Sequence, residues 1–447
     1  MKKTLLIALA LAACTFGCSK KQDEVQTPTQ ETLANAPESD TTASKDDMNQ
    51  NTRNSECQMP DFQADIDAQQ WADANNDFGF KMLAHVAEAG EGKGHVVSPY
   101  SAERAIGMVL DGACGNTLTQ MYRAMHLPLA KNVSAAGAQV DKYFNEEFGP
   151  NVTIDVDNKV WVEKTITLLA DYTTSLKANY DIEVRNMDFK GDPEGARQAI
   201  NDDIYKATHE KISDLIQKGM ITPLTKAVLT NAIYFKAPWA ENFPAEATDK
   251  ADFFTANGAI KVDMMHHSKR HRVFVDDKIT AIDLAFAESP FSLVILMPTA
   301  GEQLQPDALK TLQQNMNAKA FRELSQKMQS KDTVLSLPKF KIETSIPLNS
   351  LLKSLGMTEA FSDDADFSRM TGKKDLFISD VIQKAFIDVN ENGTEAAAAT
   401  AVVMRMKAMM RPNPEPPVTV TIDHPFMYAL VENQSGAILF LGDVQNF

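Results

Sequence analysis

Two short stretches of the chain have residue types that could do chemistry, but neither has the spacing that the chemistry needs. Residues 90–94 have a phosphate-loop composition, yet they lack the glycine spacing and the Lys-Ser/Thr ending of a nucleotide loop. His209-Glu210 has no second histidine four residues after the first to complete a zinc helix, and no Gly-x-Ser-x-Gly elbow occurs. The sequence therefore predicts no enzyme activity and no cofactor.

A cluster of histidines is the one candidate for a metal site. The cluster comprises His266, His267 and His271. Three lysine and arginine residues stand among them and would repel a metal ion. We expect an exposed polar edge or turn here, and no metal site.

The most informative stretch runs from Glu391 to Val403 and is rich in alanine. Alanine favours a helix, but this run follows a strand-like segment, ends in β-branched Val402-Val403 and leads into the Pro-rich residues 412–417. Read as a strand, one face carries only small or β-branched residues, and the single charge, Glu395, falls on the other face. Such a segment could enter a buried sheet position with its small side chains inward, and nothing bulky anchors it elsewhere.

The rest of the chain predicts helices first and strands later. Apolar residues recur at helical spacing in 67–88, 101–111, 117–126, 134–147 and 193–217. Strand-like runs are Ala227–Phe235, Phe291–Met297, Thr333–Lys341, Lys384–Val389, Val418–Ile422 and Ala437–Leu441. Without regular alternation of the two, this order indicates an α+β fold with a large mixed sheet.

The amino terminus predicts an exported lipoprotein. Residues 1–18 read as a basic start followed by a short apolar run, and the cysteine of Leu11-Ala12-Ala13-Cys14 resembles the lipid-accepting cysteine of a bacterial lipobox, with Cys18 as the alternative. A plain cleaved signal is the remaining interpretation. Neither Thr15 nor Ser19 is the aspartate of inner-membrane retention, so we expect a surface-exposed outer-membrane protein, with the periplasmic face or secretion as alternatives.

By composition, the chain after residue 18 divides into two parts. Residues 19–64 are polar with almost no aromatic residue and predict a flexible tether, and 65–447 form one domain with no repeat at a fixed period. A formal charge of −16 argues against a nucleic-acid partner. The four cysteines are too few for a disulfide framework, and the state of Cys57 and Cys114 is left open.

From about residue 70 to 447 the sequence resembles the serpins, the serine protease inhibitor family. The motifs that carry the resemblance are Ser98-Pro99-Tyr100-Ser101, Gly115–Met121, Asn231–Trp239, Asp423-His424-Pro425-Phe426 and Ile438–Gly442. The resemblance implies a monomeric inhibitor that works once: a protease cuts an exposed reactive loop, about residues 393–417, and is trapped as an acyl complex while the loop inserts into the main sheet. It implies serine proteases as partners, and cysteine proteases as a further class.

The resemblance also implies roles for individual residues. The hinge that enters first comprises Gly393, Thr394, Glu395, Ala396, Ala397, Ala398, Ala399, Thr400 and Ala401. The residues matched to loop opening are Glu391, Lys339, Trp239, Ser98, Ser101, Asn231 and Gln383. Gln383 departs from the family, which usually has histidine there, so opening need not have the same pH response.

Counting from Gly393 puts the reactive bond at Lys407-Ala408, which suits a trypsin-like protease. The loop is longer than in many relatives, so Arg405, Met406 or Arg411 could be attacked instead, and its four methionines could admit proteases of broader specificity. Because the hinge is almost entirely small or hydroxylated, we expect an inhibitor. The alternative is a non-inhibitory member that serves as a surface binding module.

Overall fold

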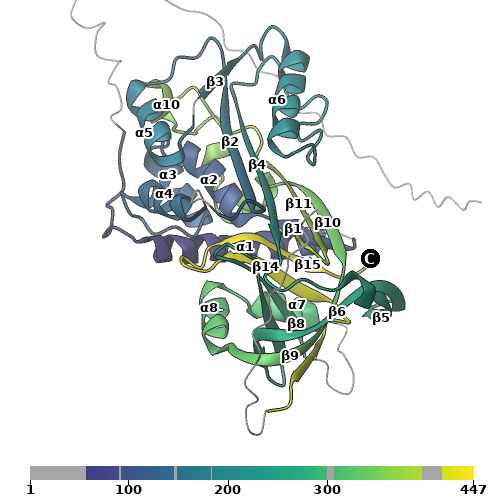
Figure 1. The fold of residues 1–447 in the computed structure, drawn as a ribbon. Coiled ribbons are helices and arrows are strands. Elements are labelled where there is room, and N and C mark those ends of the chain that lie inside the picture. Colours follow the sequence, from purple (N-terminus) through teal and green to yellow (C-terminus); the bar gives the residue numbers. More distant parts are fainter. Residues whose placement is uncertain (1–56, 90–91, 145–147, 183, 300–306, 395–414) are drawn as a thin grey trace, which may run out of the picture. The chain divides into compact units, whose positions relative to one another are not determined.

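Figure 1 shows a computed structural model that describes residues 57–447 apart from 90–91, 145–147, 183, 300–306 and 395–414. The predicted signal and lipid-bearing cysteines, the hinge from Glu395 to Ala401, and Lys407-Ala408 lie outside the described residues. Among the residues that are described, no helix is long and apolar enough to cross a membrane.

Two sheets organise the described part of the chain. The first has six strands in the order β10-β11-β12-β4-β2-β3. Its strands are β2 (Thr153–Glu163), β3 (Val184–Met187), β4 (Ala227–Pro238), β10 (Phe340–Pro347), β11 (Ile382–Asn390) and β12 (Gly393–Thr394). The second has nine, in the order β1-β15-β14-β8-β7-β6-β9-β13 with β5 beside β6. Its strands are β1 (Gly94–Val97), β5 (Asp249–Thr255), β6 (Gly258–Val275), β7 (Ile279–Ala285), β8 (Phe291–Pro298), β9 (Gln329–Pro338), β13 (Val418–Thr421), β14 (Phe426–Glu432) and β15 (Ile438–Val444).

Helices surround the two sheets in the part of the chain that the structure describes. They are α1 (Ala68–Ala89), α2 (Pro99–Leu110), α3 (Gly115–Ala124), α4 (Val133–Phe144), α5 (Ala170–Tyr180), α6 (Pro193–Ala207), α7 (Ala308–Asn315), α8 (Ala318–Lys327), α9 (Asn349–Ser354) and α10 (Ser368–Thr371), with 3₁₀ turns at Ala245–Ala247 and Glu359–Phe361. In Figure 1, α6 lies on the opposite side of β2 and β4 from α2. The prediction of an α+β fold with a large mixed sheet is confirmed.

Two polar residues fix where the helices next to the six-stranded sheet begin. The Ser98 side chain accepts a hydrogen bond from the Ser101 N–H at the start of α2, and Asp192 does the same for Gly195 at the start of α6. A proline follows each cap at the first helical position, where its missing N–H costs nothing. Sequence therefore sets the register of both helices against the sheet.

The predicted helix 193–217 is wrong beyond Ala207. His209 and Glu210 adopt positive φ, and the Thr208 hydroxyl donates to Ile204 O and accepts from the Ile212 N–H, so the chain leaves the helix. Four later apolar residues still pack with α6 in a small core over β2 and β4; they are Ile212, Leu215, Ile216 and Ile221. The helical spacing here reflects this shared burial. We call residues 208–225 the strap.

The start of the folded part also differs from the prediction. A disulfide joins Cys57 to Cys114, and the Gly115 N–H donates to Gln58 O. Gln63 pairs with Ala130 as an isolated bridge. Residues 57–64, predicted as tether, are therefore fastened to the domain.

Candidate functional site

The first two residues of the predicted hinge already form a strand. Gly393 and Thr394 make up β12, which pairs antiparallel with β11 on one side and with β4 on the other. Thr394 is 1% exposed, and its hydroxyl accepts a hydrogen bond from the Ala237 N–H. Thr394 belongs to the face of the hinge with only small or β-branched residues, and it is the one member of that face among the described residues.

Gly393 has a conformation and a contact that exclude any side chain. Its φ is +140°, and a Cβ built there would lie 2.0 Å from the carbonyl oxygen of Ala237. Because the clash is with backbone, the neighbouring strand could not move aside cheaply. Glycine is required for the chain to pass from the turn after β11 into the sheet.

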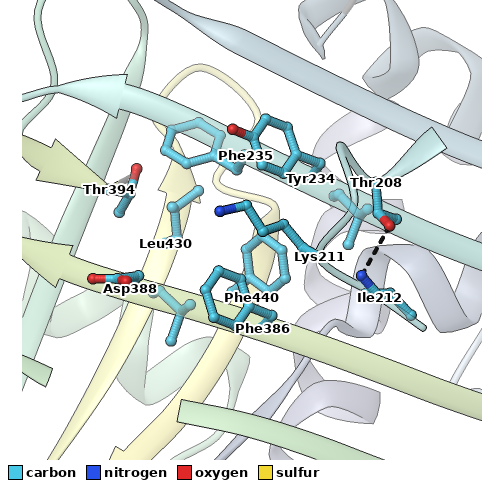
Figure 2. Close-up of a pocket in the computed structure, with 12 residues that line it drawn as sticks. Thr208, Lys211, Ile212, Tyr234, Phe235, Phe386, Asp388, Thr394, Leu430 and Phe440 are labelled. Atoms are coloured by element: carbon cyan, nitrogen blue, oxygen red, sulfur yellow. Dashed lines mark hydrogen bonds between the residues drawn. The ribbon is translucent and has the colours of Figure 1, made fainter. Parts of the chain in front are cut away.

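Beyond Thr394, β4 and β11 border a narrow seam (Figure 2). Strand residues line it on both sides, the strap covers it through Lys211 and Ile212, and β14 and β15 close it from behind through Leu430 and Phe440. The free space is about 10 Å³, close to the volume that one water molecule needs. The seam can admit a further strand only if β4 and β11 separate.

Polar groups fasten the far end of the seam. Gln383 of β11 accepts from the Ser98 N–H at 2.9 Å and donates to Ser98 O at 2.7 Å, so it joins the strand to the start of α2. Ser98, Ser101 and Gln383 are all buried. Asn231 lies in β4, opposite Asn158 of β2 in the ladder. From Val389 to Gln383 the seam follows six residues of β11, or about 20 Å.

The near end, which we call the mouth, is held by contacts to the turn at residues 390–392. Trp239 donates from its backbone N–H to Asn392 O at 3.0 Å and from Nε1 to Asn390 O at 2.9 Å. The Phe243 N–H donates to Glu391 O at 3.1 Å. All three carbonyls of the turn are therefore bound by one short segment after β4.

The Glu391 side chain adds a charged contact at the mouth. Its carboxylate lies 3.0 Å from Lys339 Nζ and accepts from the Thr248 hydroxyl at 3.0 Å. Burial acts to raise the pKa of Glu391, but hydrogen bonds to the backbone, to Lys339 and to Thr248 outweigh burial and hold the pKa below its usual value. Glu391 is therefore ionised at neutral pH and ties β11 to the start of β10.

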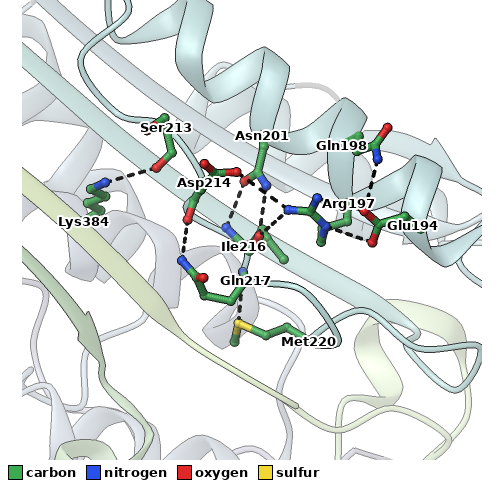
Figure 3. A network of polar contacts seen from close by, with 10 residues as sticks. All are labelled: Glu194, Arg197, Gln198, Asn201, Ser213, Asp214, Ile216, Gln217, Met220 and Lys384. Carbon is green, nitrogen blue, oxygen red and sulfur yellow. Dashed lines mark hydrogen bonds and ion pairs between the residues drawn. The ribbon is translucent and has the colours of Figure 1, made fainter.

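The strap is pinned on both sides of the seam (Figure 3). Lys384 of β11 donates to Ser213 O at 3.1 Å. From α6, Asn201 makes a two-way bond with the backbone of Ile216, and Arg197 also donates to Ile216 O. A strand that enters the seam must widen the sheet beneath the strap, so these bonds oppose its insertion.

The structure brings the sequence-predicted residues together in two groups. Glu391, Lys339 and Trp239 meet at the mouth; Ser98, Ser101 and Gln383 meet at the far end. The sequence did not reveal the roles of the strap or Lys384, because the periodicity of 193–217 looked like one helix. Within the described residues, no group of three or more His, Cys, Asp or Glu could hold a metal ion.

Comparisons with known proteins agree with this geometry. The family model described as serpin (serine protease inhibitor) matches residues 73–447. The human leukocyte elastase inhibitor is 34% identical over 84% of this chain and 98% of its own length. Two solved structures cover 85% of the chain: human thyroxine-binding globulin complexed with thyroxine (26% identity, TM-score 0.74, 99% of its length) and Serpin48 of the insect Tenebrio molitor (29%, 0.73, 98%). The chain belongs to the serpin family.

Proposed function

We propose that the protein is a single-use inhibitor of serine endopeptidases, and of cysteine endopeptidases as a second class. The observation that carries the proposal is the position of Gly393 and Thr394, which already occupy the sheet between β11 and β4. The hinge residues that follow are small except for Glu395, so the next of them can continue into the seam. Relatives named as elastase inhibitors support protease inhibition.

The proposed reaction begins at the Lys407-Ala408 bond. The nucleophilic oxygen or sulfur of the protease bonds to the carbonyl carbon of Lys407, the peptide bond breaks, and the amine of Ala408 leaves with a proton. The freed loop then continues from Thr394 along the seam and carries the acylated protease with it. From Thr394 to Lys407 a strand at about 3.3 Å per residue is roughly 46 Å long, more than twice the length of the seam from Val389 to Gln383.

The polar groups at the two ends of the seam have distinct proposed roles. Trp239, Glu391 and Lys339 hold the mouth in register, so that the hinge enters in one alignment. Ser98, Ser101, Gln383 and Asn231 govern how the far end separates. Since Gln383 does not titrate, the opening of the far end should not depend on pH through this residue.

The residue whose peptide bond is attacked determines the class of protease that we expect the protein to inhibit. A lysine at this position fits the acidic pocket of trypsin-like proteases through charge-assisted hydrogen bonds. Arg405 and Arg411 offer the same chemistry and Met406 a different one, so they are the alternatives. Lys407 is preferred to Arg405 because attack two residues earlier would leave a shorter inserted strand.

The proposed location is the surface of a bacterial outer membrane, with lipid on Cys14 or Cys18. The Cys57–Cys114 disulfide supports export, because disulfides persist in oxidising compartments. The disulfide also fastens the end of the tether to the domain, so a pull on the tether would act on the loop before α3. The periplasmic face and secretion are the alternatives.

A second candidate is a non-inhibitory binding module, favoured by the structural likeness to thyroxine-binding globulin.

One experiment separates the inhibitor from the binding module. The domain is mixed with a trypsin-like protease and run on a denaturing gel, and mass spectrometry identifies the released carboxy-terminal fragment. We expect a covalent complex and a fragment that begins at Ala408. Cleaved domain without a complex would support the binding module, and a fragment that begins at Met406 would move the attacked residue to Arg405.

A further inference from the structure

Two histidines expected at an exposed edge or turn are instead buried in the middle of β6. His267 and His271 are 7% and 8% exposed, and their Nε2 atoms lie 3.0 Å apart. Residues four apart on one face of a straight strand are separated by about 13 Å, so the two side chains lean toward each other over Lys269. The prediction of an exposed edge or turn was wrong because the ladder with β9 spans the whole segment.

The contact between the rings depends on their protonation. When both are neutral, one Nε2–H donates to the lone pair of the other, and a singly protonated pair can keep that bond. When both rings are protonated, two N–H groups face each other at 3.0 Å with like charge. The second proton therefore drives the rings apart.

Charged groups of both signs surround the pair. On β6 itself lie Lys269, Arg270 and Arg272, and β9 places Lys331 opposite His271. The acids that face this region are Glu241 before β5, Asp283 of β7 and Asp332 of β9, and they are paired with Lys269, Arg272 and Arg270 in that order. Around His271, Glu241 acts to raise the pKa and Lys269 acts to lower it, so the charges largely offset each other.

Burial is the largest cause that favours the neutral form of the pair. Burial, and after it the neighbouring His271, lower the pKa of His267 to about 4, and burial also lowers the pKa of His271. A histidine whose pKa is depressed in the closed arrangement favours the separated arrangement increasingly as pH falls below its ordinary value of about 6.5. The acid window therefore runs from about 6.5 downward toward 4.

The pair supports the mouth through one aromatic ring. His267 stacks on Phe243 with ring centroids 3.9 Å apart and planes within 7°. Phe243 in turn binds Glu391 O through its N–H and meets the Trp239 ring edge-on at 6.3 Å. Both histidines, Trp239 and Phe243 line a cavity of about 360 Å³, which gives a displaced ring room to move.

We propose that the His267–His271 pair positions the mouth of the seam, and that protonation of both rings loosens the mouth so that the intact loop inserts without being cut. The proposal rests on the proposed function, since it concerns the same loop and seam. Acid would thus convert the active chain into an inactive, loop-inserted form. The pair is a positioning element and touches no protease.

The test incubates uncut protein at pH values from 7.5 to 4.5, returns it to pH 7.5 and measures the remaining inhibition of a trypsin-like protease. We expect the wild type to lose inhibition at least about tenfold faster at pH 5 than at pH 7.5 and to return with a raised melting temperature. His271→Gln keeps a hydrogen bond to His267 but cannot take the second proton, so its loss of inhibition should depend on pH clearly less than that of the wild type. His266→Gln is the matched control on the same strand and should behave as the wild type, because His266 contacts Ser336 and Asp249 instead.

The outcomes separate this inference from the proposed function. Inhibition at neutral pH with a flat pH profile in the wild type, or the same profile in His271→Gln and the wild type, would overturn the role of the pair alone. Lack of inhibition at neutral pH would overturn the proposed function, and the acid-induced rise in melting temperature would still test the pair. If His271→Gln is unstable, His267→Gln serves as the second variant with the same expected weaker pH dependence.

Discussion

Replacement of Thr394 by arginine is expected to convert the inhibitor into a substrate. Thr394 is already buried at the start of the seam, so an arginine there should push β12 out of the sheet, and the cut loop could then insert only by burying an unpaired charge between β4 and β11. A cost of about 3 kcal/mol slows insertion by roughly a hundredfold, so the protease deacylates first. The loop should still be cut, and the covalent complex should disappear from a denaturing gel.

A matched change one residue later tests the assignment of faces. Glu395→Arg also introduces a long cationic side chain, but the alternation of a strand puts residue 395 on the outer face. We expect Glu395→Arg to retain most of the covalent complex. A Thr394→Arg variant that traps protease at the wild-type yield would contradict the inward face.

Cleavage of the loop between Val403 and Arg411 should raise the melting temperature. Beyond Thr394, which already pairs with Ala237, about ten added residues can pair along β4. At a net hydrogen-bond contribution of about 0.5–1.5 kcal/mol each, they would stabilise the cut chain by roughly 10 kcal/mol. At about 2.1 cal/mol/K of unfolding entropy per residue, a folded unit of about 390 residues then melts roughly 12 °C higher. Calorimetry of intact and cut protein measures the change.

The cut Thr394→Arg variant is the control for this second result. Its hinge should not advance, so its melting temperature should stay close to that of the intact variant. A wild-type chain that melts at the same temperature before and after a confirmed cut would indicate a relative whose loop does not insert.

Much of the fold could be predicted from residue patterns alone. The starts of α2 and α6 follow from Ser98-Pro99 and Asp192-Pro193, and β11 follows from an alternation whose buried face is Gln383, Ala385, Ile387 and Val389. The small-residue face of the hinge was also predicted from sequence, and the structure buries its first member. These features are local, so a few neighbouring residues determine them.

The features that were missed depend on contacts between distant residues. Thr333–Lys341 looked like one strand, yet the chain forms β9 up to Pro338 and starts β10 at Phe340, in different sheets. The histidines of β6 are buried because β9 and the segment after β4 cover them, which no window around residue 267 reveals. The Cys57–Cys114 disulfide likewise joins residues 57 positions apart.

Some residues of the candidate site were predicted from the resemblance to serpins, and others only became apparent from contacts in the structure. Charge and spacing do not link Lys339 to Glu391, and the resemblance to serpins did. The hydrogen bonds of Gln383 to Ser98 could not be predicted from either residue, because they join β11 to the start of a helix 285 positions away. The strap over the seam had no sequence signal of its own.

Hydrogen exchange along β4 and β11, before and after the loop is cut, tests the central claim most directly. The claim is that the cut loop becomes a strand between these two. We expect those backbone amides of β11 that do not pair with β10, and those of β4 that do not pair with β2, to exchange at least about tenfold more slowly after cleavage. Amides of the β6–β9 ladder serve as the internal reference and should not change. Unchanged exchange in both β4 and β11 after a confirmed cut would contradict insertion of the loop.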